Sequence, residues 1–183
     1  ITQSRRWLPD EVGGVVWYGP SNGDLTCYVP FYAGVNYVTE AMNSKAGSHQ
    51  EFTRESFRWA VSTVNTFADL MYNSISKDIK VMIEKYTGRF MKEQPIIDLL
   101  AVELFKSSPK AAREYLTDYC NNNVISARDA WWGLLDELFR KYDMTNVYAA
   151  ETQKRVPGVW NEDFVRTMVK ADPPGQPGEI TNN

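Results

Sequence analysis

Two residue types that often carry chemistry in proteins are scarce in this chain. Among its 183 residues there is one histidine, His49, and there are two cysteines, Cys27 and Cys120. Two cysteines do not make a disulfide framework. A single histidine, without a cysteine pair at metal-binding spacing, does not make a metal site. We therefore expect no bound metal, and we expect His49 to be an ordinary surface residue.

The chain also lacks a long apolar run and a cluster of basic residues. No stretch is long enough to cross a bilayer, so we expect no membrane span. The formal net charge is −3, and without a basic patch the chain has no electrostatic footprint for nucleic acid. The first residue is Ile1 rather than an initiator methionine, which indicates a mature, processed or excised piece. The compartment therefore stays open, because an export signal could have been removed.

Aromatic residues are abundant instead, with six tryptophans and ten tyrosines. The runs 14–18 and 26–31 have the β-branched and aromatic content of strands. Asn22–Gly23 lies between them and is a turn signal, because both residues tolerate positive φ. The sequence thus predicts a β-hairpin. A hairpin alone is marginally stable in water, so we expect this one to complete a sheet that lies upstream.

The pattern after the hairpin is helical. Thr53 is a plausible N-cap, and apolar residues then recur at helical spacing as far as Tyr86. Gly88 is the expected end of this long helix. Further helices are expected over 96–106 with Pro95 at the first position, over 110–119 after Ser108–Pro109, over 127–142, and over 161–169. A bend or break is expected at 121–123, because asparagine side chains compete for backbone hydrogen bonds.

These patterns predict an α+β protein that is mostly α. An N-terminal β-hairpin is followed by four or five helices, one of them long. A hydrophobic content of 43% over this length suits a single domain with a real core. The expected division is a hairpin over 1–42, a helical region over 49–170 and a frayed tail over 171–183.

Three segments carry a resemblance that covers most of the chain, to about Tyr142. They are W-L-P-D-E-V-G-G-V-V-W-Y-G-P at 7–20 with T-C-Y-V-P-F-Y-A-G-V at 26–35, then Arg54–Tyr72 with Ile75–Ile79, then Leu116–Asn123 with Asp129–Trp132. In this order they resemble the late part of the dipeptidase and secernin family of N-terminal-nucleophile hydrolases. None of the three is a catalytic signature, and the specificity comes from their length and order.

The resemblance implies the C-terminal part of an αββα fold and a peptidase that cleaves short peptides, typically dipeptides, without a cofactor. In such enzymes the nucleophile is a cysteine that becomes the first residue, and its own α-amino group serves as the base. This sequence has Ile1 at that position. We therefore expect the nucleophile to lie in an upstream part of the same protein, and we expect this piece alone to be inactive.

Several residues are candidates for the wall of a substrate pocket. Arg5 could bind a substrate carboxylate, although a basic pair at a chain start is usually solvated. Tyr18 and Tyr28 lie on the hairpin, where core packing is the default. Asn121 and Asn122 could donate to an oxyanion or orient a carboxylate, or they could cap a helix and bond to loop backbone. We favour the structural role for both asparagines.

The remaining chemical candidates favour structural roles. Cys27 is expected to be a small buried hydrophobe, and Cys120 a buried inert thiol. Trp131 and Trp132 lie 100° apart on a helix, so one should fill the core and the other an interface with an upstream domain or an oligomer partner.

The sequence supports two functions of different classes. The first is the C-terminal segment of a cysteine-type dipeptidase, which acts on short peptides together with its upstream part. The alternative is a non-catalytic helical interaction module related to such enzymes. Three features favour it: the missing nucleophile, the single histidine and the many aromatic residues. Homo-oligomerisation is compatible with both.

Overall fold

The N-terminal strands form one antiparallel sheet in the computed structural model, which describes residues 1–43, 51–143, 146–158, 162 and 165–166. Its strands lie in the order β1 (Thr2–Ser4), β2 (Gly14–Tyr18) and β3 (Val29–Tyr32). The predicted hairpin is confirmed as β2 and β3, although β3 begins three residues later than expected. The chain also supplies a third strand, β1, which pairs with β2. The sequence did not predict this strand, because β1 is short and polar.

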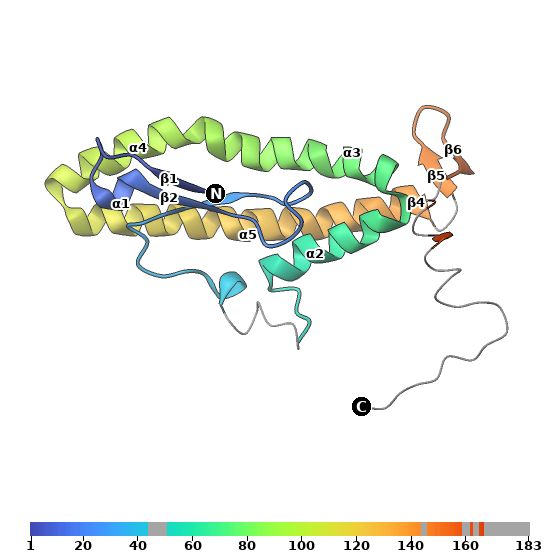
Figure 1. Ribbon diagram of the computed structural model, residues 1–183, viewed down its shortest axis with the longest axis horizontal. Coiled ribbons are helices and arrows are strands. Elements are labelled where there is room, and N and C mark those ends of the chain that lie inside the picture. Colours follow the sequence, from blue (N-terminus) through green and yellow to red (C-terminus); the bar gives the residue numbers. More distant parts are fainter. Residues whose placement is uncertain (44–50, 144–145, 159–161, 163–164, 167–183) are drawn as a thin grey trace.

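Along β2, one face of this sheet is covered and the other is open. Along β2 the side chains of Val15 and Trp17 are buried, whereas Val16 and Tyr18 are exposed. This alternation follows from the pleat, which turns successive side chains to opposite faces. The short helix α1 (Asp10–Gly13) connects β1 to β2, and the covered face packs toward the helices (Figure 1).

The long helix expected to end at Gly88 has different bounds in the structure. Helix α2 (Phe57–Ala68) begins after Ser56, whose side chain accepts a hydrogen bond from the backbone of Trp59. A 3-10 turn, η2 (Asp69–Met71), follows. Met71 leaves the helical region with φ −141° and ψ 58°, so the chain turns there before α3 (Tyr72–Ile83). Thr53 is therefore not the N-cap, and residues 57–88 are not one helix.

The rod that does form runs through the expected stop. Helix α3 continues through a π-helical turn, η3 (Glu84–Gly88), into α4 (Arg89–Ser107). Gly88 keeps a helical backbone with φ −60° and ψ −39°, and Pro95 lies inside α4 rather than at its start. Packing explains the difference, because Tyr86 and Phe90 on either side of Gly88 are held in ring contact, and Tyr86 also contacts Trp131.

Helix α5 (Pro109–Lys141) runs beside this rod for its whole length (Figure 1). The predicted start is confirmed, because Ser108 caps the helix through the backbone N–H of Ala111 and Pro109 takes the first position. The predicted break at 121–123 is wrong. Cys120 and Val124 on either side of the asparagines are fully buried, and this burial outweighs the weak helix propensity of asparagine.

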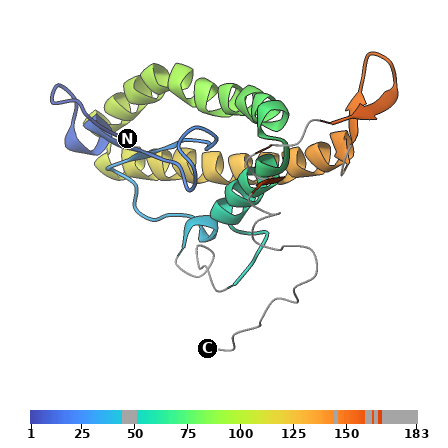
Figure 2. The same ribbon diagram turned by 45° about the vertical axis from the view of Figure 1, so that its right-hand side comes forward.

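Helix α2 crosses α5 on the side away from α3, as the turned view makes clear (Figure 2). A 3-10 turn, η1 (Glu40–Met42), lies near the start of α2.

After α5 the chain forms a small antiparallel sheet of β4 (Tyr142–Asp143), β5 (Asn146–Ala149) and β6 (Lys154–Pro157). These strands were not predicted within 49–170, because they are short and mostly exposed. The expected helix over 161–169 falls largely outside the described residues, as do His49 and the tail. The division into 1–42, 49–170 and 171–183 stays a prediction.

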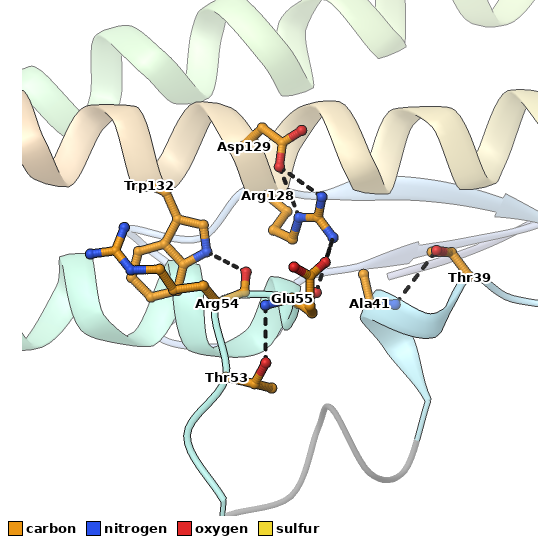
Figure 3. A network of polar contacts seen from close by, with 8 residues as sticks. All are labelled: Thr39, Ala41, Thr53, Arg54, Glu55, Arg128, Asp129 and Trp132. Carbon is orange, nitrogen blue, oxygen red and sulfur yellow. Dashed lines mark hydrogen bonds and ion pairs between the residues drawn. The ribbon is translucent and has the colours of Figure 1, made fainter.

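The segment before α2 is fastened to α5 by polar contacts (Figure 3). Arg128 donates to the carboxylate of Glu55 at 2.9 Å and to the backbone oxygen of Glu55 at 3.2 Å. The indole N–H of Trp132 donates to the backbone oxygen of Arg54 at 2.7 Å, and the Arg54 guanidinium lies over the indole ring. Trp131 fills the core as expected, but Trp132 is covered by this chain's own segment rather than by another domain or subunit.

Among the described helices, none is both long enough and apolar enough to cross a membrane.

Two residues of α3 test how much of the stability comes from the core. Ile75 is fully buried, whereas Val81 is exposed on the same helix. We expect Ile75→Ala to lower the free energy of unfolding by about 2–5 kcal/mol, and Val81→Ala to change it by less than about 0.5 kcal/mol. Urea denaturation followed by circular dichroism measures both, and equal losses would contradict this placement of α3.

Candidate functional site

Arg5 lies just after β1 and binds inward rather than standing in solvent. Its guanidinium forms an ion pair with the carboxylate of Asp98 on α4. The same side chain donates to the backbone oxygen of Val12 at 2.7 Å and to that of Gly13 at 3.4 Å, and it is only 14% exposed. The expectation of a solvated Arg5 is therefore wrong. Its donors are engaged by the chain itself, which leaves little capacity for a substrate carboxylate.

Asp98 joins Arg5 to a second strand. Its other carboxylate oxygen accepts a hydrogen bond from the hydroxyl of Tyr32 on β3 at 2.8 Å. Burial, together with the adjacent Asp98 carboxylate, raises the pKa of Tyr32 well above its ordinary value. Tyr32 therefore stays protonated and acts as a donor at physiological pH. The cluster of Arg5, Asp98 and Tyr32 ties both edge strands of the sheet to α4.

A groove opens beside this cluster, between the segment after β1 and α4. Its volume is about 420 Å³. It is lined by Arg5, Trp7, Leu8, Gln94, Pro95, Asp98, Leu99 and Val102. The lining is mostly apolar, and it contains no nucleophilic side chain. This groove can hold an apolar group, but its own residues offer no means of cleaving an amide bond.

Tyr28 lies beside a second, smaller hollow of about 140 Å³. The hollow is lined by Ile1, Gln3, Trp17, Tyr28, Thr87 and Met91. The hydroxyl of Thr87 accepts a hydrogen bond from the backbone N–H of Tyr28 at 2.9 Å and donates one to the backbone oxygen of Tyr28 at 3.1 Å. Thr87 belongs to the π-helical turn η3, a type of turn that is frequent at functional sites. The turn thus fixes the backbone of Tyr28 at the rim of the hollow.

The two asparagines point to different sides of α5. Asn121 is buried, and its side-chain oxygen accepts a hydrogen bond from the backbone N–H of Thr39 at 2.8 Å. Its amide nitrogen donates to the backbone oxygen of Tyr37 at 3.2 Å. Asn122 is exposed. Asn121 therefore fastens the loop after β3 to α5, and Asn122 does not share that position.

Both thiols are buried, as the sequence predicted. Burial raises the pKa of Cys27 to about 12, and it raises that of Cys120 to about 12 as well. The thiolate is the reactive form of cysteine, so neither side chain is a competent nucleophile near neutral pH. Nor is either residue placed at a chain terminus, where a free α-amino group could serve as its base.

The predicted pocket residues do not converge on one site. Arg5 and Tyr28 lie beside different concavities, Tyr18 lies on the open face of the sheet, and Asn121 lies under a loop. Among the described residues, no group of three or more His, Cys, Asp or Glu side chains is placed to hold a metal ion. Sequence reasoning missed Asp98 and Thr87, because each is a single polar residue in a helical stretch with nothing in the pattern to mark its distant partner.

Comparison with known proteins finds a family model that matches part of the chain. A model described as Peptidase family C69, the dipeptidase A family, matches residues 1–85. The match covers the N-terminal sheet, α2 and α3, and it confirms the resemblance over that range. The segments quoted from 116 to 132 lie beyond it. No curated protein and no solved structure matches the chain.

The two asparagines form a matched pair for mutation. Asn121→Ala leaves the backbone groups of Tyr37 and Thr39 without their partner, so we expect a loss of about 1–3 kcal/mol in the free energy of unfolding. Asn122→Ala removes an exposed side chain from a helix interior and should be neutral or slightly stabilising. Chemical denaturation measures both, and similar losses for the two would contradict the bonding seen for Asn121.

Thiol labelling tests the burial of both cysteines. With a pKa of about 12 the thiolate fraction at pH 8 is on the order of 10⁻⁴. We expect the native protein to react with a thiol-specific disulfide reagent far more slowly than the same protein in guanidinium chloride, where both thiols should react promptly. Prompt labelling of either thiol under native conditions would show that its environment is not the one described.

Proposed function

We propose that this chain, whose residues 1–85 match peptidase family C69, is the C-terminal segment of a cysteine-type dipeptidase. In this proposal the intact protein hydrolyses peptide bonds in short peptides, and the nucleophilic cysteine lies in a preceding segment. The observation that carries the proposal is the family match. It covers the N-terminal sheet and the first part of the helical layer, so it concerns a folded unit rather than a short pattern.

The state of the two thiols supports the placement of the nucleophile elsewhere. The family mechanism uses a terminal cysteine whose α-amino group acts as general base. Cys27 lies just before β3 and Cys120 lies within α5, so neither has a free α-amino group, and burial raises both pKa values to about 12. We infer that this segment contributes structure and part of a pocket wall, while a partner segment contributes the reacting atoms.

The open face of the N-terminal sheet offers a place for that partner segment. Val16 is 47% exposed and Tyr18 is 37% exposed on this face. Apolar side chains of this size on an open strand favour a covering layer. We infer that the upstream part of the protein packs on this face and completes an αββα arrangement. Tyr18 is then the pocket candidate best placed to meet substrate, and Tyr28 lines the smaller hollow.

Arg5, Asn121 and Asn122 have weaker claims to substrate contact. The polar groups of Arg5 and Asn121 bind the chain's own backbone or Asp98. In the proposed enzyme they would fix the sheet and the loop after β3, whereas Asn122 would remain at the surface of α5.

A second function is favoured by one observation. Helix α4 exposes several large apolar side chains, which suits a protein-binding surface. A non-catalytic helical interaction module would have such a surface and would need no nucleophile. The presence or absence of dipeptide hydrolysis by the intact protein separates the two functions.

The test compares the 183-residue chain with the same chain preceded by the upstream coding segment of its gene. We expect no release of amino acids from a panel of dipeptides by the chain alone, because it holds no competent nucleophile. The extended protein should hydrolyse dipeptides, and replacing its processed N-terminal cysteine by serine should abolish turnover. Chromatographic detection of free amino acids measures all three.

A matched control uses the cysteines of this segment. Cys27→Ala together with Cys120→Ala in the extended protein should leave turnover in place, because neither thiol takes part in the reaction. Turnover by the purified 183-residue chain would contradict the proposal that this chain lacks the nucleophile. A folded extended protein without any dipeptidase activity would favour the interaction module.

A further inference from the structure

Strand β1 forms one outer edge of the N-terminal sheet, and its backbone groups alternate between β2 and that edge. Ile1 exchanges hydrogen bonds with the backbone of Trp17 on β2, at 3.1 and 2.8 Å. In an antiparallel pair, the next residue along the strand turns its N–H and C=O groups to the other side, and the one after it turns back. In agreement with this alternation, the backbone N–H of Arg5 donates to the backbone oxygen of Gly13 at 3.1 Å.

The residues between, Thr2 and Ser4, therefore turn their N–H and C=O groups outward. Both residues are exposed, and among the described strands β1 pairs with β2 alone. Natural sheets protect such an edge with a proline, a charged residue, a bulge or a covering element. The strand reads Thr-Gln-Ser and keeps a regular register with β2. Its outer edge thus carries none of these protections within the described part of the chain.

The opposite edge of the sheet, along β3, is closed. Trp17 bonds to β1, so its register partner Pro30 faces the outer edge of β3, where it has no N–H to offer. Two residues earlier, the N–H and the C=O of Tyr28 are both bonded to the hydroxyl of Thr87, at 2.9 and 3.1 Å. Strand β3 also packs against α5. A further strand can therefore join this sheet at β1 but not at β3.

We propose that a strand from the upstream segment, the part of the proposed enzyme that precedes Ile1, pairs with the outer edge of β1. This inference rests on the proposed function, which supplies that segment. Outward N–H and C=O groups on an exposed edge are recognised by another extended backbone. Thr2 lies opposite Val16 in the register, so the open edge continues into the exposed side of β2. One upstream segment can therefore pair with the edge and cover that side.

The size of the edge favours a tethered strand over a separate molecule. Strand β1 has three residues, and only Thr2 and Ser4 turn their backbone groups outward. A stable interface between separate proteins buries about 1,200–2,000 Å² in total, which is far more than so short an edge provides. A segment of the same protein is held beside the edge by the chain itself, which raises its effective concentration there. A second copy of this chain lacks that advantage.

Hydrogen exchange tests the pairing at single backbone amides. Fragmentation mass spectrometry resolves these amides in the 183-residue chain and in the chain preceded by its upstream coding segment. In the 183-residue chain we expect Thr2 and Ser4 to exchange at least about tenfold faster than Gln3 and Arg5, whose N–H groups face β2. In the extended protein we expect all four amides to exchange within about threefold of one another, because both sides of β1 are then paired.

Proline variants test the same contact through stability. Thr2→Pro with Ser4→Pro removes both outward N–H groups, and proline is tolerated on an edge strand but not inside a sheet. We expect the unfolding equilibrium constant, measured in urea, to change by less than about threefold in the 183-residue chain and to rise at least about tenfold in the extended protein.

The matched control, Thr2→Val with Ser4→Ala, alters the same side chains and keeps both N–H groups. It should leave the unfolding equilibrium constant of either protein within about threefold of the original. Equal losses for the proline and control variants in the extended protein would contradict the pairing.

Two exchange results would also overturn the inference. One is fast exchange of Thr2 and Ser4 in the extended protein. The other is protection of these amides that already appears in the 183-residue chain and increases with its concentration, which would assign the edge to a second copy.

Dipeptide hydrolysis is measured on the same extended protein, so that the two proposals can fail separately. An active enzyme in which Thr2 and Ser4 exchange fast would contradict the pairing and leave the proposed function in place. Protected amides in a protein without dipeptidase activity would support the pairing and contradict the proposed enzyme.

Discussion

The burial of one face of α5 is the interaction on which the rest of the fold depends. The helix is 33 residues long, which is about 50 Å at 1.5 Å per residue. Leu116, Val124, Ala127 and Trp131 along it are fully buried. Helix α2, helix α4 and strand β3 all pack against α5. Because apolar burial is roughly proportional to area and non-directional, it holds these elements together without fixing how they are oriented.

Orientation comes from a few polar contacts at the edges of that surface. Asp98 receives Arg5 and Tyr32 and thereby sets the sheet against α4. Arg128 donates a hydrogen bond to the carboxylate of Glu55, just before α2. At the far end, the carboxylate of Asp78 on α3 accepts hydrogen bonds from Lys141 and Tyr142, which close α3 onto the end of α5. Directional contacts of this kind select one arrangement among the many that would bury similar area.

The features that the sequence predicted well are those with a local cause. The cap at Ser108 depends on a few neighbouring residues, and both strands of the hairpin follow from their own composition. The start of α5 was predicted for the same reason. A family resemblance was also visible, because it rests on ordered segments that can be compared without knowing the fold.

The failures have non-local causes. Gly88 and the asparagines of α5 were expected to end or break helices, but contacts with a distant aromatic ring and a loop outweigh their propensities. The chain turns at Met71, and the neighbouring sequence contains no glycine or proline from which this turn could have been predicted. For the candidate site, the engagement of Arg5 depends on Asp98, which lies 93 residues away, and no spacing rule connects two such positions.

The separation between Arg5 and Asp98 also bears on the order in which the chain folds. Gln3 and Gln94 are joined across a similar distance of 91 residues, whereas α3, η3 and α4 are held by contacts within a single continuous stretch. The entropy lost on closing a loop rises with its length, so contacts that span half the chain form at the greatest entropic cost. Helices and the pairing of β1 with β2 can form before these contacts exist, but the sheet becomes fixed against α4 only when the first residues meet the middle of the chain.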